Sequence, residues 1–320
     1  MKILITGGAG FIGSHFAERV VSKKNQTLVL DDLSTGSISN LSSIWFSSYF
    51  KFIKGSVLDF KLLENLVNRV DVIYHLAASV GVRMIIEDPV HSIENNILGT
   101  INVLRLAAKK KKKILITSTS EVYGKSSKET FGEDDDLVFG SPFKSRWNYA
   151  SSKLLDEHLG LAYFKKNHLP VTIVRLFNTV GERQTGRYGM VIPLFMKQAM
   201  SNQDITVYGD GSQSRCFCYV KDVVWAMTKL MDNKESFGNI YNIGGVEEVR
   251  INDLADRIIG LTNSLSKKVY IPYEKVYGGE FDEPKRRKPD ISKIKSLIGF
   301  EPKTKLSDIL LAVKAFYEHE

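Results

Sequence analysis

The chain has few cysteines: only two in 320 residues, placed close together as Cys216-x-Cys218. A lone Cys-x-Cys has no second pair with which to build a structural zinc site or a disulfide framework, so no metal site is expected. Disulfides belong mainly to oxidising compartments, and their absence favours a reducing, cytoplasmic location as the default.

Long apolar runs are also missing. The apolar start, Lys2 to Thr6, breaks at once into glycines, unlike a signal peptide, and no later stretch is typical of a membrane span. The chain has no internal repeat and no low-complexity linker. With 43% hydrophobic and 25% charged residues, it is predicted to be an ordinary soluble globular protein without a membrane partner.

Basic residues exceed acidic ones, 44 to 36, for a net charge of +8 that suits anionic ligands. The basic run from Lys109 to Lys113 is best interpreted as a solvated helix end, where cations complement the helix dipole. No interleaved aromatic residues or nucleic-acid motif accompany it, so no nucleic-acid partner is expected.

Strand and helix patterns alternate along the chain, which predicts an α/β fold with a parallel sheet covered on both faces. The predicted strands are Lys2 to Thr6, Leu28 to Leu30, Phe50 to Ile53, Val72 to His75, Ile114 to Thr117 and Val171 to Leu176. The predicted helices are Phe16 to Ser22, Lys61 to Asn68, Ile93 to Lys109 and Trp147 to Lys166.

A glycine-rich loop joins the first strand to the first helix. Gly7, Gly10 and Gly13 have the Gly-x-x-Gly-x-x-Gly spacing of a dinucleotide-binding turn, which places a pyrophosphate at a helix N-terminus. Asp31 ends the second strand, where a carboxylate accepts hydrogen bonds from ribose hydroxyls and disfavours a 2′-phosphate. The pattern predicts NAD rather than NADP as the cofactor. The alternative, that these glycines serve turns only, is less favoured.

Tyr149 and Lys153 form a Tyr-x-x-x-Lys pair in a predicted helix. The four-residue spacing puts both side chains on one face, one turn apart. An ammonium held there favours the phenolate and predicts a lowered pKa for Tyr149, making it a general base near neutral pH. Such a pair is common by chance, and its weight comes from the flanking motifs.

These motifs together resemble an extended short-chain dehydrogenase that acts on nucleotide sugars. The residues that carry the resemblance are the glycine loop, His75-Leu76-Ala77-Ala78, Asn96, Ser118-Thr119-Ser120-Glu121-Val122-Tyr123-Gly124 and Tyr149-x-x-x-Lys153. The resemblance implies a Rossmann-type doubly wound parallel sheet with a smaller C-terminal α/β substrate lobe. It further implies tightly held NAD, a nucleotide-sugar substrate and a homodimer built on two helices per subunit.

The expected division places the NAD-binding domain at residues 1–178 and the nucleotide-sugar lobe at 179–320, with the chain able to cross back. By position, the resemblance implies cofactor contacts at Gly7, Gly10, Phe11, Ile12, Gly13, Asp31, Asp32, Ser34, Ser56, Val57, Leu76, Ala77, Ala78, Asn96, Tyr149 and Lys153. Ser56 departs from the family, which usually has an acid touching the adenine at this point.

The resemblance also assigns substrate contacts. Asn178 corresponds to an asparagine at the sugar diphosphate, and Arg215 would neutralise phosphate oxygens, a role suited to a guanidinium. The implied substrate-binding set is Asn178, Arg183, Arg187, Val191, Val207, Tyr208, Arg215 and Tyr277. For Arg215, a surface ion pair is the competing interpretation.

The implied catalytic set is Thr119, Ser120, Glu121, Tyr149, Lys153 and Arg287. Tyr149 would take the proton of the sugar C4 hydroxyl while hydride passes to NAD, and Thr119 would hydrogen-bond that hydroxyl. Simple 4-epimerases usually lack a carboxylate where Glu121 stands. With Ser120 and Arg287, Glu121 resembles the UDP-glucuronic acid decarboxylases of the aminoarabinose pathway and UDP-apiose/xylose synthases, in which a C4 ketone promotes loss of the C5 carboxylate.

Other interpretations stay open. The nearest is a UDP-sugar 4-epimerase acting on UDP-glucuronic acid or UDP-glucose, in which Arg183 or Arg187 would bind the carboxylate without its loss. A 4,6-dehydratase is disfavoured because Ser120 stands where those enzymes carry an aspartate. A non-catalytic dinucleotide-binding protein is least favoured, since Tyr149 and Lys153 are intact. Arg286 to Lys288 could also be a solvated basic turn.

Overall fold

A computed structural model of the chain describes residues 1–80, 88–144, 146–186, 190–277 and 284–319. Its centre is a seven-stranded sheet in the order β11-β6-β5-β4-β1-β2-β3, with every neighbouring pair parallel. The strands are β1 (Lys2–Thr6), β2 (Gln26–Asp31), β3 (Phe50–Lys54), β4 (Val72–His75), β5 (Lys113–Thr119), β6 (Val171–Leu176) and β11 (Asn239–Ile243).

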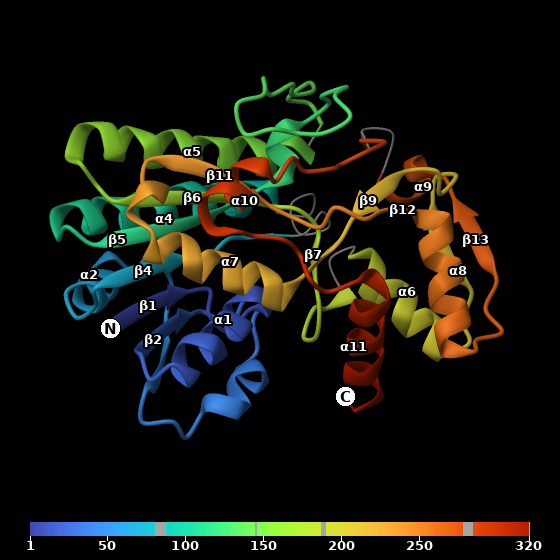
Figure 1. Cartoon of the computed structure of the whole chain (residues 1–320), viewed down its shortest axis with the longest axis horizontal. Coiled ribbons are helices and arrows are strands. Elements are labelled where there is room, and N and C mark those ends of the chain that lie inside the picture. The colour runs from blue at the N-terminus through green and yellow to red at the C-terminus, as the bar shows by residue number, and fades with distance from the viewer. Residues whose placement is uncertain (81–87, 145, 187–189, 278–283, 320) are drawn as a thin grey trace.

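Helices cover both faces of this sheet (Figure 1). One face packs against α1 (Phe11–Ser22), α7 (Val220–Asp232) and α10 (Ser292–Ile298). The other packs against α2 (Phe60–Val67), α4 (Pro89–Lys109) and α5 (Arg146–Asn167). Short 3-10 turns add η1 (Ile38–Ile44), η2 (Ser120–Tyr123) and η4 (Lys234–Ser236). The predicted doubly wound, Rossmann-type α/β fold is confirmed.

Local sequence explains where several elements begin and end. Asp59 caps α2 by accepting a hydrogen bond from the Leu62 amide, and Asp88 caps α4 in the same way ahead of a proline. At the other end of the chain, α10 stops at Gly299, which adopts a left-handed conformation that favours glycine.

A second group of elements has its own apolar core, at the right of Figure 1. Its helices are α6 (Val191–Met200), α8 (Ile251–Thr262), α9 (Tyr273–Tyr277) and α11 (Leu306–Glu318). Its strands form two-stranded sheets that pair β7 (Thr179–Val180) with β10 (Cys218–Tyr219), β9 (Ser214–Cys216) with β12 (Glu248–Arg250), and β8 (Ile205–Tyr208) with β13 (Lys268–Ile271).

The chain returns to the seven-stranded sheet after entering the second group of elements. β11 pairs with β6, from Asn239 beside Thr172 to Ile243 beside Leu176, and α7 and α10 pack on the same sheet. The last sheet strand therefore comes from far along the sequence. No helix of the described segments is long and apolar enough to cross a membrane.

Candidate active site

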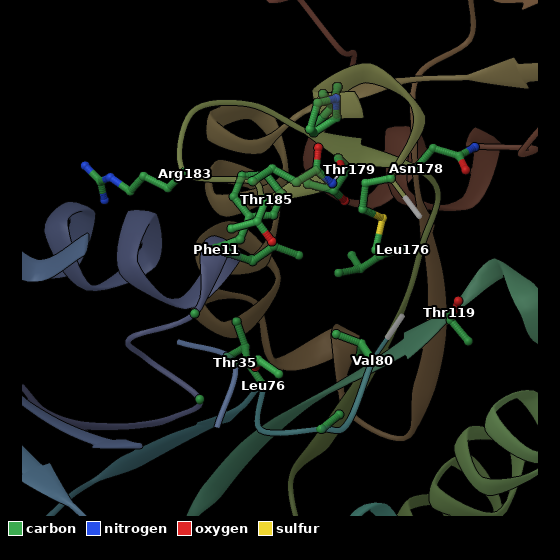
Figure 2. A pocket seen from close by; sticks show the side chains of 18 of the residues that line it. Phe11, Thr35, Leu76, Val80, Thr119, Leu176, Asn178, Thr179, Arg183 and Thr185 are labelled. Carbon is green, nitrogen blue, oxygen red and sulfur yellow. Dashed lines mark hydrogen bonds between the residues drawn. The ribbon is translucent and has the colours of Figure 1, made fainter. Parts of the chain in front are cut away.

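A cleft of about 660 Å³ opens at the carboxyl ends of the sheet strands and is also lined by the second group of elements. In parallel α/β sheets, ligands bind at this edge because the loops that follow the strands meet there. Figure 2 looks into the cleft, with Thr35 and Leu76 low in the view and Asn178 and Thr179 above them.

The glycine loop forms one wall of the cleft. Gly7 has a left-handed backbone with φ of 71°, and a Cβ there would lie 2.6 Å from the Ala77 amide nitrogen. A Cβ on Gly13 would collide with the Gly7 carbonyl. Gly10 caps α1 without any side-chain hydrogen bond, so the first-turn amides of the helix face the cleft. The loop geometry fits an anionic group such as a pyrophosphate.

Asp31 lies where β2 ends, beside the glycine loop. Its carboxylate accepts hydrogen bonds from the Ala9 amide at 2.9 Å and the Leu33 amide at 2.8 Å. Burial raises the pKa of Asp31, and these amides act in the opposite direction. Both contacts orient the carboxylate toward the cleft that it lines.

Most predicted cofactor positions line this cleft. They are Gly7, Gly10, Phe11, Ile12, Gly13, Asp31, Asp32, Ser34, Ser56, Val57, Leu76, Ala77, Ala78, Tyr149 and Lys153. Ser56, where the family usually has an acid, accepts a hydrogen bond from the Leu58 amide at 3.1 Å. Asn96 is different, because its buried side chain binds the backbone of Ser79. Its Oδ1 accepts from the Ser79 amide at 2.7 Å, and its Nδ2 donates to the Ser79 carbonyl at 3.3 Å. It acts one layer behind the cleft wall.

Tyr149 and Lys153 both line the cleft from α5, as the helical spacing predicts. The predicted lowering of the tyrosine pKa is wrong for this structure. Burial raises the pKa of Tyr149, and the carboxylates of Glu121 and Asp156 raise it further, while the Thr119 hydroxyl acts in the opposite direction. The prediction overlooked the two acids that the fold brings to the tyrosine.

Glu121 lies in the first turn of η2 and binds two arginines. Arg287 donates to its Oε1, and the Arg146 Nη2 donates to its Oε2 at 3.0 Å. Burial alone would raise the pKa of Glu121, but Arg287 and Arg146 outweigh it and hold the pKa at about 2. Arg287 is 7% exposed, so its alternative interpretation as a solvated turn is wrong.

A third arginine, Arg215, lines the cleft beside this cluster. It is 7% exposed and donates to the Ser214 carbonyl at 2.6 Å. Burial and the neighbouring Arg287 lower the pKa of Arg215 to about 9. Burial is the larger of these causes, because it disfavours the charged form of a cation. Since Arg215 is buried, the competing interpretation as a surface ion pair is wrong.

The remaining predicted substrate residues divide into two groups. Asn178, Val191 and Tyr208 line the cleft, as do Thr119 and Ser120 of the catalytic set. Arg183 also lines it, but its guanidinium binds Ser14 at 3.2 Å and Glu18 at 2.6 Å. In Figure 2 the Arg183 side chain extends away from the other labelled residues, toward the first helix.

Val207 does not reach the cleft. It is fully buried in the core of the second group of elements, while its strand neighbours Thr206 and Tyr208 line the cleft. Successive side chains of a strand point to opposite faces, so of the two neighbours that were predicted, Tyr208 lines the cleft and Val207 does not. Arg187 lies outside the described residues, and so does the side chain of Tyr277, whose backbone ends α9.

Sequence reasoning gave no role to several residues of the cleft lining, among them Arg146, Gln213 and Tyr273. Gln213 donates to the Tyr273 hydroxyl at 2.9 Å and to the Tyr208 carbonyl at 3.0 Å, which ties α9 to the cleft wall. Arg146 precedes Tyr149 by one helical turn, a spacing that could have identified it.

The sequence matches the family model described as GDP-mannose 4,6 dehydratase over residues 4–312. A UDP-N-acetyl-alpha-D-glucosaminuronate decarboxylase from Bacillus cytotoxicus is 45% identical over 302 residues, which are 94% of this chain and 92% of the relative. UDP-glucuronic acid decarboxylase 3 from Arabidopsis thaliana is 37% identical over 319 residues, covering 96% of this chain and 86% of the relative.

Two solved structures show the same architecture over the whole chain. A UDP-glucuronic acid 4-epimerase from Bacillus cereus, in complex with UDP-glucuronic acid and NAD, has a TM-score of 0.89 at 32% identity and is covered to 99%. A dTDP-glucose 4,6-dehydratase from Streptomyces venezuelae, with NAD bound, has a TM-score of 0.91 at 28% identity and is covered to 98%.

With this agreement between motifs, fold and relatives, the chain belongs to the GDP-mannose 4,6 dehydratase family, a family of extended short-chain dehydrogenases that includes nucleotide-sugar decarboxylases and epimerases.

Proposed function

We propose that this protein is an NAD-dependent enzyme that decarboxylates a UDP-hexuronic acid, UDP-glucuronic acid being the first candidate, through a 4-keto intermediate. The observation that carries the proposal is the arrangement of Glu121 between Arg146 and Arg287, beside Tyr149. The names of the decarboxylase relatives support the same reaction.

The cofactor proposal rests on the glycine loop. The uncapped first turn of α1 and the close approach allowed at Gly7 fit a pyrophosphate, and Asp31 fits an adenosine ribose. NAD, when bound, supplies a hydride acceptor beside the sugar. We propose that the part of the chain within residues 1–178 holds NAD and that 179–320 supplies most of the nucleotide-sugar contacts.

Charge is the second argument. Three buried arginines, Arg146, Arg215 and Arg287, line the cleft, whereas Glu121 is the carboxylate that pairs with two of them. Three buried guanidinium groups therefore line this part of the cleft. We propose that they bind the diphosphate and the sugar carboxylate, because guanidinium groups donate strong, often paired hydrogen bonds to anionic oxygens. A neutral UDP-hexose would lack the carboxylate.

The residues can carry out the chemistry in a defined order. Tyr149 accepts the proton of the C4 hydroxyl, aided by the Thr119 hydroxyl. Once C4 is a ketone, the C5 carboxylate belongs to a β-keto acid and leaves as carbon dioxide, placing negative charge on an enolate. Arg287 would stabilise that charge, and Glu121 would keep Arg287 oriented. Ser120, which is buried, completes the wall beside Glu121.

A homodimer is also proposed. α4 and α5 pack side by side, and their outer surfaces carry the exposed apolar residues Val90, Leu98 and Leu155. An apolar helix pair of this kind suits a four-helix contact between two copies.

Cys216 and Cys218 are buried free thiols, which fits the proposed cytoplasmic location.

Mass spectrometry of UDP-glucuronic acid after incubation with the pure protein and NAD tests the proposal. We expect loss of carbon dioxide from the sugar, and the mass of the product distinguishes the 4-keto sugar from the reduced one. UDP-N-acetylglucosaminuronic acid, tested in parallel, decides which substituent at C2 is accepted. The Tyr149→Phe variant is the control and should lose turnover by about 10²–10⁴-fold.

The 4-epimerase remains the second candidate because a UDP-glucuronic acid 4-epimerase shares this fold at 32% identity. Epimerisation would give an unchanged mass with a new retention time. That result, or full activity of the Tyr149→Phe variant, would contradict the proposed decarboxylase.

A further inference from the structure

Arg287 reaches the cleft from a connecting segment, residues 284–290, that lies between α9 and α10. α9 belongs to the second group of elements, whereas α10 packs on the seven-stranded sheet, so the segment passes from one to the other (Figure 1). The place of the Arg287 side chain therefore depends on how this segment is held at each side.

On the sheet side, backbone hydrogen bonds hold the segment. The Phe131 amide donates to the Lys288 carbonyl at 2.9 Å, and the Asp290 amide donates to the Phe131 carbonyl at 2.9 Å. The buried Asn242 of β11 adds a bond from its Nδ2 to the Asp290 carbonyl at 3.1 Å. These bonds fix the backbone that follows Arg287.

On the other side, one carboxylate holds the segment. Glu248 of β12 accepts from the Arg286 Nε at 2.6 Å on its Oε1 and from the Arg286 Nη2 at 2.5 Å on its Oε2. The Ser214 hydroxyl of β9 also donates to that Oε1, and the Ser214 amide donates to the Lys285 carbonyl at 3.0 Å. The hydrogen bonds from Arg286 are the main cause that holds the pKa of Glu248 below its usual range, so this carboxylate stays charged.

The two neighbouring arginines thus have different partners. The Arg286 side chain is 39% exposed and binds Glu248, whereas the Arg287 side chain is 8% exposed and binds Glu121. A bidentate guanidinium–carboxylate pair fixes direction as well as distance, because its two hydrogen bonds must be satisfied together. The Arg286 pair therefore limits how far the backbone can shift or turn immediately before Arg287.

We propose that Glu248 and Arg286 are positioning residues: their ion pair anchors the connecting segment on β12 and thereby holds the Arg287 guanidinium against Glu121 in the cleft. This inference rests on the proposed role of Arg287 in stabilising the enolate. Displacing a group that acts on the reacting atoms by about 1 Å can lower the rate by about 10²-fold. An exposed ion pair contributes little to folding stability, so its removal should change the rate without unfolding the protein.

The test is a double-mutant cycle between Glu248→Gln and Arg287→Gln. We expect Glu248→Gln alone to lower turnover of the UDP-hexuronic acid by about tenfold or more, with a melting temperature near that of the wild type. In the Arg287→Gln background the same substitution should have no further effect, because the group that it positions is absent. Arg286→Gln should reproduce the effect of Glu248→Gln, and it takes the place of that variant in the cycle if Glu248→Gln does not fold.

The redox state of the cofactor gives a second readout, which a merely structural role would not change. In the proposed reaction, oxidation at C4 does not need Arg287, but loss of carbon dioxide does. Reduced cofactor should therefore accumulate at steady state in Glu248→Gln, and its absorbance should exceed that of the wild type.

Glu247→Gln is the matched control, because Glu247 precedes Glu248 in the chain and also pairs with an arginine. Its partner is Arg257, at 2.8 Å, which lies on α8 and not in the connecting segment. This variant should leave both turnover and the level of reduced cofactor unchanged. Unchanged turnover in Glu248→Gln, additive losses in the double mutant, or an equal loss in Glu247→Gln would overturn the proposal.

A crystal structure of Glu248→Gln with NAD bound separates this inference from the proposed function. We expect the Arg287 guanidinium to leave Glu121 or to occupy several orientations, whereas Glu247→Gln should keep it in place. A displaced Arg287, in a protein whose wild type removes no carbon dioxide from either UDP-hexuronic acid, would contradict the proposed function alone. Decarboxylation by the wild type, with Arg287 unmoved in Glu248→Gln, would contradict the role of Glu248 and Arg286 alone.

Discussion

Two acid–arginine clusters differ in stoichiometry: one joins α5 to β6, and the other joins η2 to α5 and to Arg287. Glu157 receives the Arg175 Nε at 2.9 Å, its Nη2 at 2.8 Å and the Ser118 hydroxyl at 2.5 Å. One acid thus meets one arginine, and the pair is closed off from the cleft, being absent from its lining. In the other cluster, Glu121 meets two arginines in the cleft wall.

This difference separates a structural use of the ion pair from a functional one. A matched pair with every hydrogen bond satisfied leaves no charge for a ligand. Glu121 and its two arginines instead line the cleft, where a ligand can reach them, and the Glu121 side chain is 20% exposed. Variants of each cluster, the pH dependence of stability and an exposed ion pair test this difference.

The largest effect is expected from Glu157→Gln. Removing one member of a buried ion pair leaves Arg175 uncompensated, which should lower the free energy of unfolding by about 3–5 kcal/mol. Thermal denaturation measures the loss. Turnover per folded molecule at low temperature should stay near the wild-type value, and a variant that melts normally but is inactive would show that the two clusters are not separate.

Arg287→Gln should lower turnover and leave stability nearly unchanged, the reverse of what is expected for Glu157→Gln. We expect turnover of the UDP-hexuronic acid to fall by about 10²–10³-fold, because the cation proposed to stabilise the enolate is lost. The melting temperature should change little, since Arg146 still pairs with Glu121. Product analysis by mass spectrometry provides the readout, and unchanged decarboxylation would remove Arg287 from the mechanism.

A smaller effect is expected from acidification. The pKa of Glu121 is about 2 in the folded protein against an ordinary 4.5, so its contribution to stability is fully present above pH 4.5 and is lost as the pH falls toward 2. Thermal melts across this window should fall less steeply in Glu121→Gln than in the wild type. Parallel slopes in the two proteins would mean that Glu121 is not held by its arginines in solution.

The smallest effect sets the scale for an exposed pair. Lys109 bonds Glu64 at 3.1 Å, with side chains 63% and 33% exposed. Lys109→Ala should change the free energy of unfolding by less than about 1 kcal/mol, because solvent and salt screen surface charges. Chemical denaturation measures this, and a loss as large as that of Glu157→Gln would show that burial is not what separates these pairs.

Local patterns predicted the elements that hold the cofactor side of the cleft. Lys2–Thr6, Val72–His75 and Val171–Leu176 are strands with the predicted bounds, because a central parallel strand is a short, largely apolar stretch that can be recognised in the sequence. The glycine loop and the Tyr149 to Lys153 spacing were also readable, since backbone strain and helical period depend on near neighbours.

Long-range contacts were not readable in this way. β11 joins the sheet from Asn239–Ile243, and no local signal says that this strand pairs with β6 rather than with the second group of elements. Val207 and Tyr208 were both predicted to bind the substrate, because nothing in this short strand indicates which face is inward. Adjacent side chains of a strand point to opposite sides, so only Tyr208 lines the cleft.

The sequence by itself determined the class of fold, the glycine loop, the acid at Asp31 and the helical face shared by Tyr149 and Lys153, because each follows from the periodicity and conformational limits of adjacent residues. Only the tertiary structure decided the charge state of the site. Arg287 reaches Glu121 across 166 positions of sequence, and Asp156 is made into a counter-ion of Lys153 by its complete burial. Electrostatic energies depend on distance and burial, and both are properties of the folded chain.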